Sequence, residues 1–434
     1  MLETYPETLE LFPVTGGVAK TIAVPGSKSI TNRALVLAAL AQAKDGCRLE
    51  GVLRSEDTEV MVDCLRKLGF RLDVDWDRSE IAVASNSHRL IPAAHAELFA
   101  ANSGTSIRFL SALVSLGKGT YRLDGVARMR ERPIQDLLDA LRQLGVSARS
   151  ELGNGCPPVV IDAQGIVGGT VEIRGNTSSQ FLSALMMIAP FTEKGLTIRL
   201  SGELVSEPYI VMTRRMLESW GAAVDQPETG VYQIAPGLDG ERTSYAIEPD
   251  ASAASYFFAA AAVLQGRVTV LGLPEPSLQG DVAFVDVLEQ MGCRVERCSN
   301  GITVHGRPLR GVDVDMNAIS DTVMTLGAVA CFAVGPTTIR NVGHIRHKET
   351  DRIAALAAEL RKVGAEVEEF AEGLRITPRP LHGAMIETYK DHRMAMGLAL
   401  VGLRVPGVVI RNPGCVAKTY PGFWRDWTNW TDKS

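Results

Sequence analysis

Six stretches of the chain share one arrangement of positions: a short polar opening, followed by a segment that is apolar on nearly every side. They read SKSITNRALVLAALA, NSGTSIRFLSALVSL, NTSSQFLSALMMIAP, DASAASYFFAAAAVL, SDTVMTLGAVACFAV and KDHRMAMGLALVGL. A helix that is apolar all round is typical of a protein interior. The pattern therefore predicts six buried helices whose only polar parts are their N-terminal turns.

Between these segments, a glycine followed by an alternating apolar strand pattern recurs six times. After five of these strands and their polar loops comes an amphipathic helix pattern that ends in glycine, where a helix C-terminus favours a left-handed residue. The recurrence predicts repeated supersecondary units of strands and helices. The strand copies begin at Gly46, Gly119, Gly195, Gly266, Gly335 and Gly407, and the glycines that end the helices are Gly69, Gly145, Gly221, Gly292 and Gly364.

A chain of 434 residues is too long for one ordinary core, and two large lobes fit the six units best. With three units in each lobe, the polar helix ends could converge on a cleft between the lobes and form an anion site in duplicate. The stretch YAIEPDAS enters the fourth unit, and the strand KTIAVPGS precedes the first. We therefore expect hinge strands near Ser27 and Glu248, with residues 1–26 and 248–434 in a C-terminal lobe and 27–247 in an N-terminal lobe.

The polar openings contain cations as well as hydroxyl groups. Six helices need six caps, and capping alone is the simpler interpretation of any single copy. Capping does not explain the cations, because a cation near a helix N-terminus opposes the helix dipole. These cations are Lys28, Arg33, Arg108 and Arg393. They indicate an anion in front of these helix ends.

Two loops are densely charged. ARMRERPIQDLL carries Arg128 and two further arginines, and HIRHKETDRIAAL carries His344, Lys348, Glu349 and Arg352. A solvated charged surface is the alternative interpretation of both loops. The histidines of the second loop have a spacing that suits a metal, but no third ligand is evident and we expect no metal site.

Asp321 in ISDTVMT, Arg393 in KDHRMAMG and Lys418 in GCVAKTYPGFW complete the charged set. Taken one at a time, each of these residues can be explained as a helix cap or as a charged residue on the surface. Together, several cations and few carboxylates favour a substrate with phosphate and carboxylate groups. The chain has no Walker A loop and no GxGxxG at the start of a βαβ unit, so we expect no nucleotide cofactor.

The composition narrows the location and the partners. A formal net charge of -5 argues against general binding to nucleic acid or to an anionic membrane surface. The seven cysteines are scattered and odd in number, which favours reduced thiols. The acidic N-terminal stretch does not resemble a signal peptide, and no apolar run is as long as a membrane span. We expect a cytoplasmic protein.

The motifs closely resemble those of the 5-enolpyruvylshikimate-3-phosphate synthase (3-phosphoshikimate 1-carboxyvinyltransferase) family. PGSKSITNRALVLAAL, NSGTSIRFL, RMRERPI, TSSQFLSALM, PDASAASYF, HKETDR, YKDHRMAM and CVAKTYPGF occur in family order along the whole chain. The resemblance implies an α/β fold, a two-lobed inside-out α/β barrel in which each lobe has three βαβαββ repeats around buried parallel helices. It also implies transfer of enolpyruvyl from phosphoenolpyruvate to the 5-hydroxyl of shikimate 3-phosphate, with release of phosphate, by a monomer without cofactors.

The same resemblance assigns residues to roles. Asp321 is the implied base for the attacking hydroxyl, Glu349 the implied proton donor to the methylene carbon, and Lys28 the implied contact to both substrates. Implied ligands of shikimate 3-phosphate are Lys28, Ser29, Arg33, Ser178, Ser179, Gln180, Ser206, Tyr209, Asp321, His344 and Lys348. Implied ligands of phosphoenolpyruvate are Lys28, Asn102, Gly104, Arg128, Gln180, Arg352, Arg393 and Lys418.

Two positions depart from the family pattern. His344 stands where the family often has asparagine, which leaves its contact to shikimate open. Phe109 follows Arg108 where many members have proline, and we expect this to alter sensitivity to the inhibitor glyphosate.

Two other functions stay open at this stage. One is the related enzyme that transfers enolpyruvyl to UDP-N-acetylglucosamine, although its typical loop cysteine is absent from GVARMRERP. The other is a non-catalytic protein that binds phosphate ligands. Asp321 and Glu349 argue against that protein, because anion binding gains nothing from two carboxylates. Substrate-driven closure of the lobes is expected for the enzyme.

Overall fold

The computed structural model describes residues 5–41, 43–85, 89–428 and 430; residues 1–4, 42, 86–88, 429 and 431–434 lie outside the described part. The chain divides into two compact units, which we call unit 1 (Met1–Pro25 with Glu248–Ser434) and unit 2 (Gly26–Ile247).

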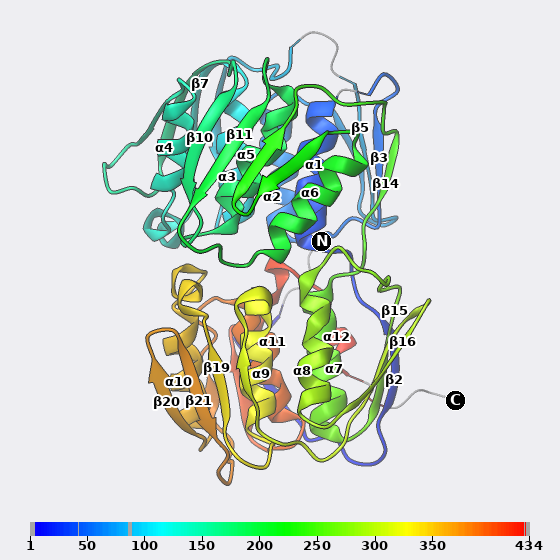
Figure 1. Ribbon diagram of the computed structural model, residues 1–434. Coiled ribbons are helices and arrows are strands. Elements are labelled where there is room, and N and C mark those ends of the chain that lie inside the picture. Colours follow the sequence, from blue (N-terminus) through cyan, green and yellow to red (C-terminus); the bar gives the residue numbers. More distant parts are fainter. Residues whose placement is uncertain (1–4, 42, 86–88, 429, 431–434) are drawn as a thin grey trace. The chain divides into compact units, whose positions relative to one another are not determined.

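Three helices form the interior of unit 2: α1 (Lys28–Ala41), α3 (Gly104–Ser115) and α5 (Ser179–Ile188). Every residue of α3 is buried, and α1 is buried from Ile30 to Leu40. This burial follows from their apolar sequences, because a helix without a polar face has to be covered on all sides. The expected buried helices are confirmed here, and the strands and the helices α2, α4 and α6 surround them (Figure 1).

The wall of unit 2 consists of three four-stranded sheets in the described residues, with the orders β14-β3-β5-β4, β6-β7-β9-β8 and β10-β11-β13-β12. In each sheet the glycine-led strand pairs in parallel with one neighbour and antiparallel with the other. β14 joins β3, so the end of the third repeat completes the sheet of the first. The strands are β3 (Cys47–Glu50), β4 (Leu72–Asp75), β5 (Glu80–Val83), β6 (His95–Phe99), β7 (Lys118–Asp124), β8 (Ser147–Ser150), β9 (Val159–Gln164), β10 (Gly169–Arg174), β11 (Leu196–Ser201), β12 (Val224–Glu228), β13 (Val231–Ile234) and β14 (Ser244–Ala246).

Unit 1 repeats this plan around α7 (Ala251–Leu264), α9 (Val323–Ala330) and α11 (His392–Gly402). Its sheets have the orders β16-β17-β15-β2, β18-β19-β21-β20 and β1-β23-β22 in the described residues. β1 and β2 come from the first 25 residues, so the start of the chain completes two sheets of this unit. The strands are β1 (Thr8–Leu11), β2 (Ala19–Ala23), β15 (Arg267–Leu271), β16 (Arg294–Cys298), β17 (Gly301–His305), β18 (Asp313–Asp315), β19 (Thr337–Arg340), β20 (Glu366–Phe370), β21 (Gly373–Thr377), β22 (Met385–Ile386) and β23 (Val408–Arg411).

The five amphipathic helices lie where the glycine-ended patterns predicted them: α2 (Glu56–Lys67), α4 (Gln135–Gln143), α6 (Pro208–Ser219), α8 (Phe284–Gln290) and α10 (Arg352–Lys362). All five glycines that follow them have a positive φ, from 85° at Gly145 to 116° at Gly292. This is the left-handed conformation that a helix end needs and that a side chain disfavours.

Polar side chains tie the first turns of the buried helices together within each unit. In unit 2, Asn32 Nδ2 on α1 donates to Thr105 Oγ1 on α3 at 2.8 Å, and Arg108 Nη1 on α3 donates to Gln180 Oε1 on α5 at 2.6 Å. In unit 1, the hydroxyls of Ser255 on α7 and Thr325 on α9 lie 3.3 Å apart. The N-termini of the buried helices therefore lie at the same end of each unit. Convergence of the two sets on one cleft stays a prediction.

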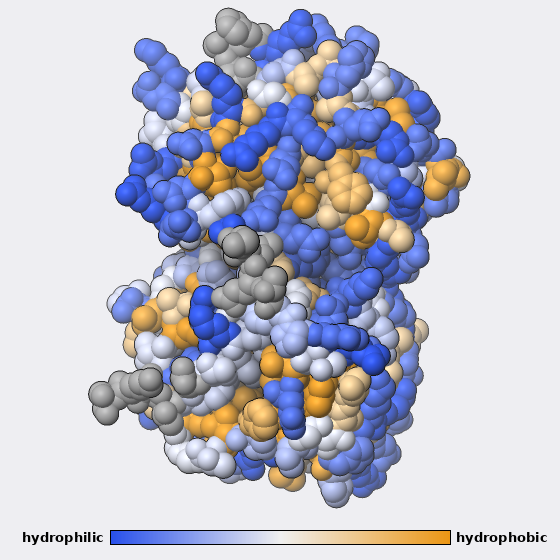
Figure 2. Space-filling model, turned by 180° about the vertical axis from the view of Figure 1, so that it is seen from behind, coloured by the Kyte–Doolittle hydropathy of each residue, from blue (hydrophilic) through white to orange (hydrophobic). Residues whose placement is uncertain are grey.

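On the face seen in Figure 2, hydrophobic residues form separate patches surrounded by hydrophilic ones. No helix in the described ranges is long and apolar enough to cross a membrane.

Two glycines give a matched test of the helix ends. Gly145 (φ +85°) has nothing within 4 Å of an added Cβ, whereas at Gly221 (φ +88°) that atom would lie 2.1 Å from the backbone oxygen of Asp239. Gly145→Ala should lower the free energy of unfolding by about 1 kcal/mol, the cost of the left-handed conformation. Gly221→Ala should lower it by about 3 kcal/mol, because overpacking adds to that cost. Urea unfolding followed by circular dichroism measures both, and equal losses would contradict this account of the helix ends.

Candidate functional site

Lys28 is the first residue of α1, and its Nζ lies 3.3 Å from Asp57 Oδ2. The side chains are 13% and 3% exposed, so this ion pair is largely removed from water. Asp57 neutralises a cation that the helix dipole disfavours. Sequence reasoning missed Asp57, because an acidic residue in the first turn of a helix is ordinary.

Arg33 lies one turn further along α1 and is 1% exposed. Its Nε donates to Thr213 Oγ1 at 2.8 Å and one Nη2 hydrogen to Ser183 Oγ at 3.0 Å. Carbonyl oxygens of Ser29 and Tyr209 accept from Nη1 and Nη2 at 3.0 and 3.4 Å. Burial lowers the pKa of the guanidinium to about 10, so it stays charged at neutral pH. Arg33 therefore fixes the backbone of two expected ligands of shikimate 3-phosphate, Ser29 and Tyr209.

Gly104 begins α3 between two buried guanidinium groups. An added Cβ there would lie 2.6 Å from Arg132 Nη2 and 3.2 Å from Arg108 Nη1, so only glycine fits without a shift. Arg132 Nη1 also donates to the carbonyl of Asn102 at 2.9 Å. The resemblance implies Arg128 of this loop as a ligand, and that assignment stays a prediction; Arg128 pairs with Glu131 at 2.7 Å and is one-third exposed. Arg132, 2% exposed, is the arginine that lies against Gly104 and Asn102.

The start of α5 supplies the next expected ligands. Ser178 is the N-cap and accepts from the backbone N–H of Gln180 at 3.3 Å, while Ser179 is buried. Ser206 precedes α6 in a left-handed conformation (φ 54°), and its carbonyl accepts from the Tyr209 N–H at 3.1 Å. Arg33 contacts Tyr209 in the first turn of α6, and Arg108 contacts Gln180 in the first turn of α5. The expected ligands at the starts of α5 and α6 therefore lie at one end of unit 2.

Phe109 is buried beside Arg33, whose guanidinium carbon lies 5.1 Å from the ring centroid. This cation–π contact stabilises the positive charge of Arg33, which is removed from water. The expected change in glyphosate sensitivity stays a prediction.

Unit 1 gathers its charges around Arg352, the first residue of α10, which is 1% exposed. Its guanidinium reaches three carboxylates: Asp391 at 2.8 Å, Glu349 at 2.8 Å and Asp321 at 3.0 Å. Burial acts to lower the pKa of Arg352, but the charges of Asp391, Glu349 and Asp321 raise it above its usual value. Arg352 is therefore permanently charged and organises the cluster.

Two more cations complete this cluster. Arg393, in the first turn of α11, donates from Nη2 to Asp321 Oδ2 at 2.6 Å. Lys418 is 4% exposed and its Nζ lies 3.9 Å from Glu349 Oε1. The structure thus brings together all five residues that the sequence predicted for this part of the site: Asp321, Glu349, Arg352, Arg393 and Lys418.

Asp391 has two roles. It is the N-cap of α11 and accepts from the backbone N–H of Arg393 at 2.9 Å. It is also completely buried and anchors Arg352. The sequence contains no direct signal for this second role, because the two residues are 39 positions apart.

His344 lies in a 3-10 helix, η5 (Gly343–His347), and Lys348 follows this helix directly. His344 Nε2 lies 3.0 Å from Ser320 Oγ, next to the expected base Asp321. Burial lowers the pKa of His344 to about 3, and the charge of Lys348 acts in the same direction. The imidazole is therefore neutral at physiological pH and offers a hydrogen bond rather than a charge. Within the described ranges, no group of three or more histidine, cysteine, aspartate or glutamate side chains could hold a metal.

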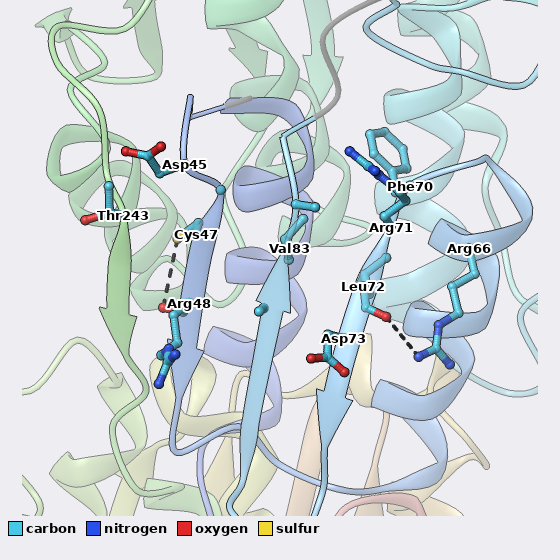
Figure 3. A pocket seen from close by; sticks show the side chains of 13 residues that line it. Asp45, Cys47, Arg48, Arg66, Phe70, Arg71, Leu72, Asp73, Val83 and Thr243 are labelled. Carbon is cyan, nitrogen blue, oxygen red and sulfur yellow. Dashed lines mark hydrogen bonds between the residues drawn. The ribbon is translucent and has the colours of Figure 1, made fainter.

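A cavity of about 680 Å³ lies away from these residues, on the sheet of β3, β4, β5 and β14 in unit 2. Figure 3 shows Asp45 and Thr243 on one side of it and Phe70 and Arg71 on the other. Two of its arginines have partners: Arg66 donates to the carbonyl of Leu72, which also lines the cavity, and Arg48 pairs with Glu80. None of the expected site residues lines it.

Comparisons with known proteins agree with the resemblance in the sequence. The family model of EPSP synthase (3-phosphoshikimate 1-carboxyvinyltransferase) matches residues 14–427. The 3-phosphoshikimate 1-carboxyvinyltransferase of Nostoc punctiforme is 48% identical over 419 residues, covering 96% of this chain and 98% of the relative. That of Shewanella loihica is 44% identical, covering 96% and 97%. The solved structure of EPSP synthase from Acinetobacter baumannii superposes with a TM-score of 0.81, covering 98% of this chain and 99% of that chain; at 24% identity it shows the shared fold alone. The expected fold class is confirmed.

The neutral state of His344 predicts a pH dependence of stability. An unfolded histidine binds a proton below about pH 6.5. Folded His344 does not do so until about pH 3, so it destabilises the protein as the pH falls. Between pH 7 and pH 5 this contribution should reach about 2 kcal/mol. His344→Asn should remove it, which urea unfolding of the ligand-free protein at both pH values measures. The exposed His382→Asn serves as the control. An unchanged pH dependence in His344→Asn would contradict the burial argument.

Proposed function

The chain belongs to the EPSP synthase (3-phosphoshikimate 1-carboxyvinyltransferase) family, and we therefore propose that it transfers the enolpyruvyl group of phosphoenolpyruvate to the 5-hydroxyl of shikimate 3-phosphate. Inorganic phosphate is released. The reaction belongs to the shikimate pathway, which leads to chorismate and the aromatic amino acids.

The observation that carries the proposal is the cluster in unit 1. Arg352, Arg393 and Lys418 are buried cations, and they lie against the carboxylates of Asp321 and Glu349. A protein that only bound phosphate would gain nothing from carboxylates beside its cations. Enolpyruvyl transfer needs both, because a proton has to be added and removed next to a substrate that carries phosphate and carboxylate groups.

Each substrate has its own expected ligands. Phosphoenolpyruvate is held by Arg352, Arg393 and Lys418 of unit 1, together with Lys28, Asn102, Gly104, Arg128 and Gln180 of unit 2. Arg132 joins this set because of its position against Gly104. Shikimate 3-phosphate is held by Lys28, Ser29, Ser178, Ser179, Gln180, Ser206 and Tyr209 of unit 2, with Arg33 fixing two of them, and by Asp321, His344 and Lys348 of unit 1.

Binding frees the catalytic groups. In the structure, Asp321 is held by Arg352 and Arg393. When the carboxylate or phosphate of phosphoenolpyruvate occupies Arg393, Asp321 loses one of these partners and becomes available to the 5-hydroxyl. The substrate anion replaces the carboxylate, so Arg393 is never left as an unpaired buried charge, which would be costly.

The chemical step then proceeds in two stages. Asp321 takes the proton of the attacking hydroxyl while Glu349, which enters this step as the carboxylic acid, protonates the methylene carbon, and a carbon–oxygen bond forms at the neighbouring carbon. In the second stage the methyl group returns its proton to Glu349 and the carbon–phosphate oxygen bond breaks, with the proton on Asp321 leaving with the phosphate. Both carboxyl groups end in their starting states. Lys418, beside Glu349, stabilises the negative charge of the substrate throughout.

We further propose that the protein acts as a monomer in the cytoplasm. The free state of all seven cysteines supports a reducing location. The proposal for the monomer rests on the resemblance.

A phosphate-release assay with phosphoenolpyruvate tests the activity. Shikimate 3-phosphate as the acceptor should give turnover, and UDP-N-acetylglucosamine should give none. Asp321→Asn should lower kcat by about 10²- to 10⁴-fold, because it removes the base but keeps the shape.

The control is Asp313→Asn, an exposed aspartate of the same unit that pairs with Arg340. It should leave kcat unchanged. Turnover of the nucleotide sugar alone would establish the related enzyme instead, and absence of turnover with either acceptor would leave a binding protein.

A further inference from the structure

Asp281 is a buried carboxyl group to which none of the roles above applies. It lies in η3 (Gly280–Ala283), directly before α8, and is 5% exposed. Ser252 Oγ, in the first turn of α7, donates to its Oδ2. Its Oδ1 has no hydrogen-bond partner among the described residues. A buried carboxylate with one neutral donor is poorly stabilised, so this side chain needs an explanation.

One hydroxyl group separates Asp281 from the expected phosphoenolpyruvate ligand Arg393. Ser252 Oγ accepts from Arg393 Nη2 at 3.5 Å, and the same nitrogen donates to Asp321 Oδ2 at 2.6 Å. A continuous polar chain therefore runs from Asp281 through Ser252 and Arg393 to the expected base.

The surroundings of Asp281 favour its neutral form. Burial is the largest effect on its pKa, and the negative charges of Asp321 on η4 (Asn317–Thr322) and Asp250 at the start of α7 add to it. Arg393 and the Ser252 hydroxyl act in the opposite direction, and the resulting pKa is about 7. The nearby phenol of Tyr256, which accepts from Arg393, contributes no charge because burial raises its pKa to about 12. Asp281 is thus poised between its two states at physiological pH.

We infer that Asp281 is a positioning residue that takes up a proton when phosphoenolpyruvate binds to Arg393. An ionised Asp281 adds a negative charge behind Arg393 and opposes the arriving anion, whereas a protonated Asp281 does not. Proton uptake and anion binding must then strengthen each other by the same factor. This inference rests on the proposed function, since it assigns the anion at Arg393 to phosphoenolpyruvate.

The pH dependence of kcat/KM for phosphoenolpyruvate, at saturating shikimate 3-phosphate, tests the inference. In the unaltered protein kcat/KM should fall as the pH rises above about 7, approaching tenfold for each pH unit. The fall in kcat/KM should result from a rise in KM, while kcat stays nearly constant. Asp281→Asn keeps the shape without the charge, and its kcat/KM should change by less than about twofold over the same range. The substrate phosphate ionises near pH 6 in every variant, so it does not affect the comparison.

Ser252→Ala provides a second variant with a different expected result. It removes the hydrogen bond that favours the ionised carboxylate, so the fall in kcat/KM should remain and move to higher pH. If Asp281→Asn retains the fall, or if Ser252→Ala leaves its midpoint unmoved, the inference is wrong. Should Asp281→Asn fail to fold, the midpoint of Ser252→Ala decides the question. An unaltered protein that does not turn over the two substrates would instead refute the proposed function.

Discussion

The structure depends on buried guanidinium groups held at the N-terminal ends of buried helices. Each such cation is disfavoured by desolvation and by the helix dipole, the dipole alone contributing about 0.3–1 kcal/mol. Arg33 on α1 and Arg393 on α11 are the clearest cases, and both reach across to neighbouring helices. The same contacts that satisfy these cations therefore fix where the helix ends lie.

The two units satisfy their cations differently, and the difference suits different tasks. Arg33 in unit 2 is surrounded by neutral hydroxyl and carbonyl acceptors, so its positive charge is preserved for a bound anion. Arg352 and Arg393 in unit 1 are paired with carboxylates. Removing one partner of a buried ion pair costs about 3–5 kcal/mol. In the proposed mechanism, a substrate anion that replaces Asp321 avoids this cost, so that one cluster holds the expected base and releases it when substrate binds. Asp281 lies behind Arg393, and the inferred proton uptake by Asp281 lowers the negative charge of the cluster when a substrate anion binds.

Much of the fold could be predicted from the sequence, because it depends on local patterns. The buried helices are apolar all round, and glycines such as Gly69 and Gly364 stand where the chain turns left-handed. Much of the candidate site was also predicted, by resemblance, and its charged residues in unit 1 lie together. Residue pairings could not be predicted in this way. Asp57 and Arg132 look ordinary in sequence, and the neutral state of His344 and the raised pKa of Asp281 arise only from burial among residues distant in the chain.

The proposed mechanism requires a substrate anion to exchange places with Asp321 on Arg393. A crystal structure with both shikimate 3-phosphate and phosphoenolpyruvate bound tests it most directly. Arg393 should then donate to oxygens of phosphoenolpyruvate, and Asp321 should lie within about 2.6–3.2 Å of the 5-hydroxyl oxygen. An Asp321–Arg393 pair that stays at its present 2.6 Å, with phosphoenolpyruvate bound away from Arg352 and Lys418, would contradict it.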